Sequence, residues 1–181
     1  MKVPLFSPYE KYSIDTEGNV YGIRGEIMIP QLSKKKYFTV TLHDGFGYKR
    51  KTIHRLMAQM FLQDFNEKLD VDHIDRNPLN NRIENLRMAT CQQNSMNKTK
   101  TSKNTSGYKS ISWNKEKQKW HARIKRNYKS IHLGYFSDIE DAREIYNKNA
   151  KELFGEFAYL ETPREKLKIK FIDQSSSSSE A

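Results

Sequence analysis

The chain has 181 residues, 36% of them hydrophobic, and a formal net charge of +10. This hydrophobic content is low for one large core, so we expect small modules. The sequence holds no apolar run long enough to span a membrane, no secretory signal at its amino terminus, and a single cysteine, which excludes an internal disulfide and a four-cysteine zinc site. We therefore expect a cytoplasmic protein.

Short strands and then a helix are predicted over residues 1–62. The turn Glu17–Asn19 separates two short apolar runs, which is typical of a β-hairpin. A second hairpin is predicted around Asp44 and Gly45, where alternating apolar residues lead into a turn. The residues that follow have helical spacing of their apolar side chains, namely Leu56, Met57, Met60 and Phe61.

The most informative stretch is VDHIDRNPLNNRIENLRMATCQQN, residues 71–94. Asp72 can offer a carboxylate and Asn94 an amide oxygen to a hard cation such as Mg²⁺. His73 can accept a proton from water, because the ordinary pKa of histidine is about 6.5. Hydrolysis of a phosphodiester needs both a cation on the phosphate and a base for the attacking water.

The order of elements around these residues is predicted to be strand, loop, strand and short helix. Asp72 and His73 would point to opposite faces within a strand, so we expect them at a strand end. The turn residues 76–78 follow directly, and Thr90 is a suitable N-cap for a helix that carries Asn94. The alternative is a polar loop of Asx turns without a chemical role.

An Asp-His pair followed by Asn85 and Asn94, with 11 and 8 intervening residues, resembles the HNH or ββα-metal motif of phage and intron homing endonucleases. The resemblance implies that Asp72 and Asn94 bind one Mg²⁺ or Mn²⁺ ion, that His73 is the general base, and that Asn85 holds the loop that orients it. Residues 9–62 resemble the N-terminal sheet and helix of the same enzymes, in which we expect His54 to be structural or to face DNA. Cys91 is expected to be a buried small hydrophobe.

The second half of the chain carries the excess of positive charge. Residues 103–136 contain nine Lys or Arg side chains and a single Glu. Three strands are predicted over residues 108–136, and then a helix with Ser137 as N-cap and Gly155 as C-cap. Concentrated basic charge with aromatic residues is typical of nucleic-acid binding, whereas the alternative is a solvated lysine-rich surface.

This half resembles the plant APETALA2/ethylene-response type of DNA-binding domain, through Trp120, Ala122, Ile124, the run 133–136 and the helix start 140–142. The resemblance implies a three-stranded sheet in the major groove of duplex DNA. Trp120 is expected to pack under the helix or to contact a base. Strand alternation places Arg123 and Lys125 on the DNA side. The remaining candidate DNA contacts are Lys109, Trp113 and His132, with Lys117, Lys119 and Lys129 on phosphates.

Together these patterns predict an α+β protein of two modules. Residues 1–98 would form a small sheet and the HNH nuclease, with its ββα-metal core over about 69–98. A flexible linker, 99–106, would lead to residues 107–160, a three-stranded antiparallel sheet packed on one helix, and then to a tail, 161–181, with a disordered end. The predicted function is site-preferring cleavage of double-stranded DNA, by a monomer in preference to an oligomer. The alternatives are a non-catalytic DNA-binding regulator on an HNH scaffold, and an RNA-binding protein.

Overall fold

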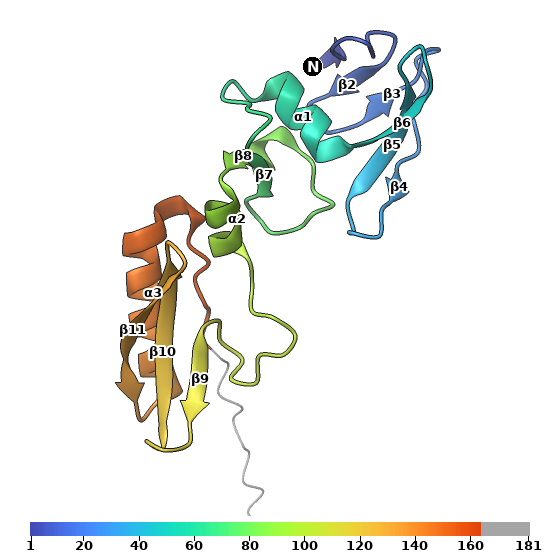
Figure 1. Cartoon of the computed structure of the whole chain (residues 1–181). Coiled ribbons are helices and arrows are strands. Elements are labelled where there is room, and N and C mark those ends of the chain that lie inside the picture. The colour runs from blue at the N-terminus through green and yellow to red at the C-terminus, as the bar shows by residue number, and fades with distance from the viewer. Residues whose placement is uncertain (164–181) are drawn as a thin grey trace, which may run out of the picture.

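The computed structural model describes residues 1–163 and forms an elongated molecule with a module at either end (Figure 1). The N-terminal end is built from two small antiparallel sheets, in which the predicted turns connect neighbouring strands. The first contains β1 (Lys2–Pro4), β2 (Ser13–Asp15) and β3 (Val20–Tyr21), and the second contains β4 (Gln31–Leu32), β5 (Phe38–His43) and β6 (Tyr48–Thr52). The predicted hairpins are therefore confirmed.

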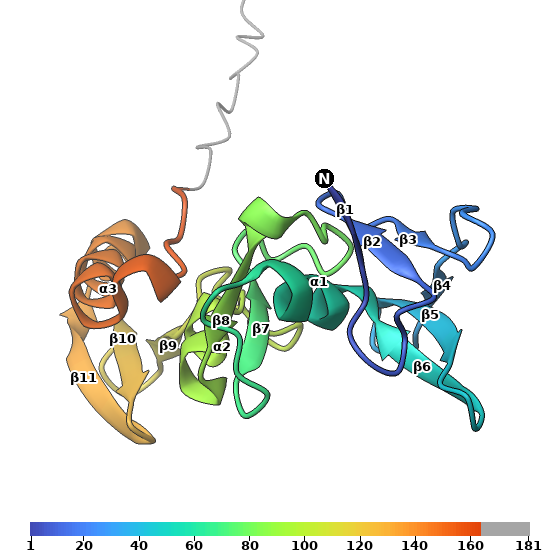
Figure 2. The same cartoon turned by 90° about the horizontal axis from the view of Figure 1, so that it is seen from above.

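The next segment has the predicted order of strand, loop, strand and helix. After α1 (Ile53–Phe61), β7 (Asp70–His73) pairs antiparallel with β8 (Leu86–Ala89), and the short 3-10 helix η1 (Ile83–Asn85) precedes β8. Helix α2 (Cys91–Asn97) follows, and Thr90 caps it in a capping box with Gln93. Seen from above, α1 lies between the N-terminal sheets and β7 (Figure 2).

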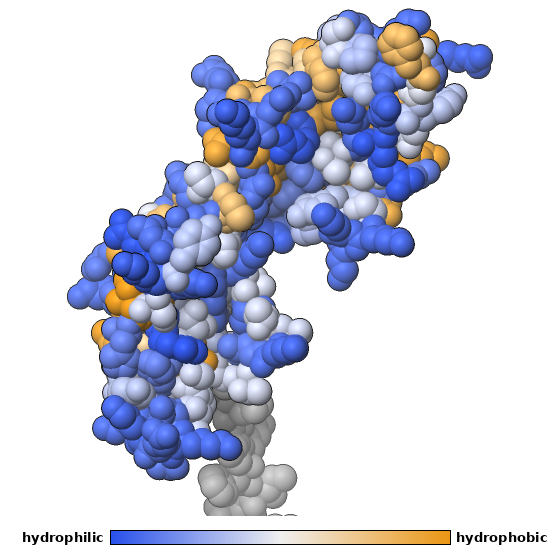
Figure 3. Space-filling view, in the orientation of Figure 1, coloured by the Kyte–Doolittle hydropathy of each residue, from blue (hydrophilic) through white to orange (hydrophobic). Residues whose placement is uncertain are grey.

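The C-terminal end contains the three predicted strands and the predicted helix. Strands β9 (Ile111–Asn114), β10 (Lys119–Arg126) and β11 (Lys129–Phe136) form an antiparallel sheet with β10 in the centre. Helix α3 (Ile139–Phe154) covers one face of this sheet, and the 3-10 helix η2 (Gly155–Phe157) follows it. On the face seen in Figure 3, hydrophilic residues dominate the C-terminal module, whereas hydrophobic patches are larger over the N-terminal end.

Each module has a hydrophobic core of its own. Ile14, Leu42 and Met57 belong to the N-terminal core, where α1 packs against β5 and β7. In the C-terminal core, Ala122, Ile124 and Tyr146 join β10 to α3. Trp120 packs against this second core, which agrees with the expectation that it packs under the helix.

Two local predictions are wrong, and the folded part extends beyond residue 160. The N-cap of α3 is Asp138 and not Ser137, because the Asp138 carboxylate accepts a hydrogen bond from the Glu140 backbone nitrogen. Cys91 is exposed, because it is the first residue of α2 and belongs to neither hydrophobic cluster. Glu161, which we assigned to the tail, is buried and bonded to Asn147. The predicted disordered end lies outside the described residues, and no described helix is long and apolar enough to cross a membrane.

Candidate active site

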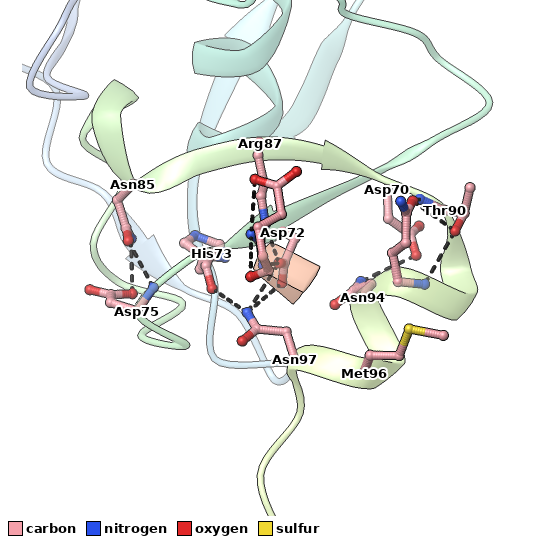
Figure 4. A network of polar contacts seen from close by, with 12 residues as sticks. Asp70, Asp72, His73, Asp75, Asn85, Arg87, Thr90, Asn94, Met96 and Asn97 are labelled. Carbon is pink, nitrogen blue, oxygen red and sulfur yellow. Dashed lines mark hydrogen bonds and ion pairs between the residues drawn. The ribbon is translucent and has the colours of Figure 1, made fainter. Parts of the chain in front are cut away.

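The carboxylate of Asp72 lies at the centre of a polar network between β7, β8 and α2 (Figure 4). Its side chain is only 5% exposed. Arg87 stands directly opposite on β8, and its Nε and Nη2 atoms donate to Asp72 Oδ2 at 2.9 and 2.8 Å. Asn97 Nδ2 lies 3.0 Å from both carboxylate oxygens. The buried charge is therefore paired and hydrogen-bonded.

His73 is the last residue of β7, so the strand ends at the Asp-His pair as predicted. The side chain is 7% exposed, and its Nε2 atom lies 3.3 Å from Asn81 Oδ1. An amide oxygen can only accept, so this contact requires the proton on Nε2 and leaves the lone pair on Nδ1. Burial lowers the pKa of His73, against the opposite effects of Asn81 and Asp75. The imidazole is therefore neutral near pH 7 and able to accept a proton.

Asn85 closes the loop that connects β7 to β8. Its Nδ2 atom donates to Asp75 Oδ1 at 2.9 Å and to the Asn80 carbonyl at 2.8 Å. Its Oδ1 atom accepts from the Asp75 backbone nitrogen at 3.0 Å. These bonds span the loop and restrict the backbone that follows His73.

Helix α2 presents two asparagines, Asn94 and Asn97, to the same cavity. Their spacing of three residues places both on one face of the helix. Asn94 Nδ2 donates to Asp70 Oδ2 at 3.2 Å, and no described residue donates a hydrogen bond to its Oδ1 atom. A cavity of about 370 Å³ is lined by Asn94 and Asn97 together with Asp72 and His73.

Asn97, Arg87 and Asn81 are functional candidates that the sequence reasoning missed. Asn97 Nδ2 also donates to the His73 carbonyl oxygen at 2.8 Å, so one amide group joins the predicted metal ligand Asp72 to the predicted base. The available signal was its helical spacing from Asn94. Arg87 had no such signal, because its pairing with Asp72 depends on the register of the two strands.

The donor set of the cavity fits a hard divalent cation. Within residues 1–163, no three side chains of His, Cys, Asp or Glu gather as a metal site. The cavity offers instead the Asp72 carboxylate and the unengaged Asn94 Oδ1. Mg²⁺ commonly takes one or two protein oxygens and completes its shell with water and phosphate, so these residues are compatible with such an ion.

The outward face of the C-terminal sheet collects most of the predicted DNA contacts. Ala122 and Ile124 are buried under α3, so alternation turns Lys119, Arg123 and Lys125 to the opposite, exposed face. His132 pairs with Arg123 across the sheet and belongs to the same face. Lys117 joins it, with Nζ 4.1 Å from the centre of the Tyr135 ring.

Three other predicted contacts lie elsewhere. Lys109 does not reach this face, because its Nζ donates to the carbonyls of Met96 and Lys98 at 2.7 and 2.6 Å, at the C-terminal end of α2. Trp113 packs edge-on against Trp120, with ring centres 5.0 Å apart, at the rim of the sheet. Lys129 is exposed at the start of β11.

Comparisons with known proteins agree with this geometry. A family model of HNH endonucleases matches residues 51–96, which span α1 through most of α2. An HNH endonuclease of Acanthamoeba polyphaga mimivirus is 42% identical over 132 residues, which cover 71% of this chain and 68% of the relative. Protein 3.8 of Escherichia phage T7 is 39% identical over 49% of this chain and 72% of the relative. The chain therefore belongs to the HNH endonuclease family.

A solved structure of a homing enzyme is also similar to this chain. The solved structure of I-HmuI, an HNH homing endonuclease that binds and cleaves DNA, has a TM-score of 0.51 and 33% identity to this chain. The match covers 54% of this chain and 56% of that structure. In sequence, I-HmuI of Bacillus phage SP01 is 38% identical over 44% of this chain and 46% of the relative.

Proposed function

We propose that this protein is a homing-type endonuclease that hydrolyses phosphodiester bonds in double-stranded DNA. The observation that carries the proposal is the convergence of Asp72, His73 and Asn94 on one cavity. Arg76, Lys98 and Lys100 line the same cavity and provide positive charge for a DNA backbone. The relatives named as endonucleases support the reaction class.

His73 is the proposed general base. Its Nε2 proton is directed to Asn81, so Nδ1 accepts the proton of the attacking water. Asn85 keeps the loop after His73 in place. Asp72 and Asn94 are the proposed ligands of one Mg²⁺ or Mn²⁺ ion, which when bound would stabilise the charge that develops on the scissile phosphate and the leaving oxygen.

The C-terminal module is the proposed DNA-positioning part. We assign residues 1–98 to cleavage, 99–106 to the connection, and 107–160 to a domain of the APETALA2 type. Its outward sheet face, with Arg123, Lys125 and His132, is suited to the major groove, which is wide enough for β-strands.

A plasmid assay tests the proposal. Supercoiled DNA is incubated with wild type, His73→Ala and the control His43→Ala, with Mg²⁺, with Mn²⁺ and with EDTA. His43 is an exposed residue of β5 outside the cavity. We expect metal-dependent relaxed or linear product from wild type and control only, while all three bind DNA equally. Intact plasmid of random sequence in Mn²⁺, with DNA bound, would favour the non-catalytic regulator.

A further inference from the structure

The side chain of Arg87 contacts both modules, so it connects the C-terminal module to the candidate active site. Two of its nitrogens donate to Asp72 on the N-terminal side. The third, Nη1, donates to the Glu156 carbonyl oxygen of η2 at 2.9 Å. The guanidinium carbon also lies 3.8 Å from the centre of the Phe157 ring. The Arg87 side chain is consequently only 13% exposed.

Phe157 is buried at the junction and not in a core. It is 8% exposed, yet it belongs to neither of the two hydrophobic clusters that the described residues form. Gly155 ends α3 with a positive φ of 53°, a conformation that favours glycine, and so turns the chain toward α2. The position of the Phe157 ring therefore depends on the fold of the C-terminal module.

Other contacts hold the same junction. Lys109 Nζ caps the last carbonyls of α2. Gln92 Nε2 donates to Asn127 Oδ1 at 2.9 Å, and the Arg76 guanidinium lies 4.7 Å from the centre of the Tyr159 ring. The two modules thus meet at β8, at α2 and at the loop after β7.

The orientation of Arg87 matters for the Asp72 carboxylate. A guanidinium commonly binds a carboxylate as a fork, with one donor on each oxygen. Here both Nε and Nη2 donate to Oδ2, while Nη1 is engaged by Glu156. Asp72 Oδ1 is left with Asn97 as its only described donor. The clamp from η2 therefore leaves one carboxylate oxygen free of the guanidinium.

We propose that Phe157 is a positioning residue of the active site, which acts through Arg87 on Asp72. The inference rests on the proposed function, in which Asp72 binds a divalent cation. Cation–π contact and the Glu156 carbonyl restrict a side chain that otherwise has many rotamers. Without the Phe157 ring, the guanidinium of Arg87 is held on this side by Glu156 alone, and it turns toward Asp72 Oδ1 and competes with the cation for it. The C-terminal module then contributes to the reaction itself as well as to DNA binding.

The test uses the full chain with Phe157→Ala, Phe157→Leu and Phe157→Tyr. Leu has a similar size but no π-face, whereas Tyr keeps the π-face. Leu160→Ala is the matched control, because Leu160 lies in the same segment and is 44% exposed. Three quantities are measured: Mn²⁺ affinity by electron paramagnetic resonance without DNA, DNA affinity in EDTA, and the maximal cleavage rate in saturating Mg²⁺.

We expect Phe157→Ala and Phe157→Leu to weaken Mn²⁺ binding and to slow cleavage by about tenfold each, as for other residues that orient a metal ligand. We expect the DNA affinity of these variants to stay within about twofold of the wild-type value. A variant that merely disrupted the fold of the C-terminal module would instead lose DNA affinity, because that module is the proposed DNA-binding part. Phe157→Tyr restores both values. If Phe157→Leu binds Mn²⁺ and cleaves like Leu160→Ala, the inference is wrong and the proposed function stands. If wild type fails to cleave, the proposed function is wrong. The inference is then decided by the Mn²⁺ affinity of Phe157→Leu alone, which must be lower than that of Leu160→Ala.

Discussion

The buried imidazole of His54 makes the stability of the N-terminal module depend on pH. His54 lies on α1 with its ring centre 4.7 Å from that of Tyr37 and 5.3 Å from that of His73. It is 8% exposed, and its Nδ1 atom has no hydrogen-bond partner within the described residues. Burial, with smaller contributions from His73 and Arg55, lowers the pKa of His54 from 6.5 to about 4.

The sign and size of the effect follow from this pKa. The folded state binds the proton less readily than the unfolded state, so stability is full above pH 6.5 and is lost as the pH falls toward about 4. Each pKa unit corresponds to about 1.4 kcal/mol, so His54 alone removes roughly 3 kcal/mol of unfolding free energy across this interval. Burial of His73 lowers its pKa too and adds in the same direction.

The experiment compares wild type with His54→Phe, which keeps a ring of similar size and removes the titrating group. Urea unfolding is followed by far-UV circular dichroism at a series of pH values from about 7.5 down to about 4. Fluorescence of Trp113 and Trp120 reports separately on the C-terminal module, which contains both tryptophans. We expect the advantage of His54→Phe to grow by roughly 3 kcal/mol toward acid pH. Parallel pH profiles of the two proteins would refute the reasoning.

Three further perturbations separate the roles of the two modules. Asn97→Ala removes the donor shared by Asp72 and the His73 carbonyl, and we expect cleavage to fall by roughly ten- to a hundredfold in the plasmid assay while DNA affinity is retained. Arg123→Ala is expected to weaken DNA binding and to reduce the slope of the logarithm of the binding constant against the logarithm of the KCl concentration by about one. Lys148→Ala, on the exposed side of α3, is the control. An unchanged slope and affinity would remove Arg123 from the DNA-binding face. Deletion of residues 103–181 is expected to lower affinity and site preference and to leave weak nicking, and full specificity of the fragment would contradict a positioning role for the second module.

Local patterns predicted the elements around the candidate site well. The strand that ends at His73, the Thr90 cap and the face of β10 that carries Arg123 all follow from residues close together in sequence. The prediction of Ser137 as N-cap was wrong, because the neighbouring Asp138 is an equally good capping residue type and only the geometry separates the two.

Contacts between distant segments could not be predicted. Arg87 and Phe157 are 70 positions apart, and their stacking depends on how η2 docks against β8. Lys109 was a candidate DNA contact by its position in the C-terminal domain, yet its amino group caps α2. The hydrophobic periodicity around Arg87 and Phe157 predicts the local strand or turn, and it does not predict which surface of the other module each side chain will contact.

The two asparagines of α2 show how the structure refines a motif. Asn94 matches the spacing of the family motif, whereas Asn97 makes the direct bonds to Asp72. Those bonds use Nδ2, a donor, and a donor cannot bind a cation. Asn94 donates its Nδ2 to Asp70 Oδ2, and no described residue donates to its Oδ1 atom at the cavity wall. No described residue donates to the Oδ1 atom of either asparagine, so atom type alone does not choose between them. We propose Asn94 for the cation because its position matches the family motif, and Asn97 for the orientation of the carboxylate because its Nδ2 atom bonds both oxygens of Asp72.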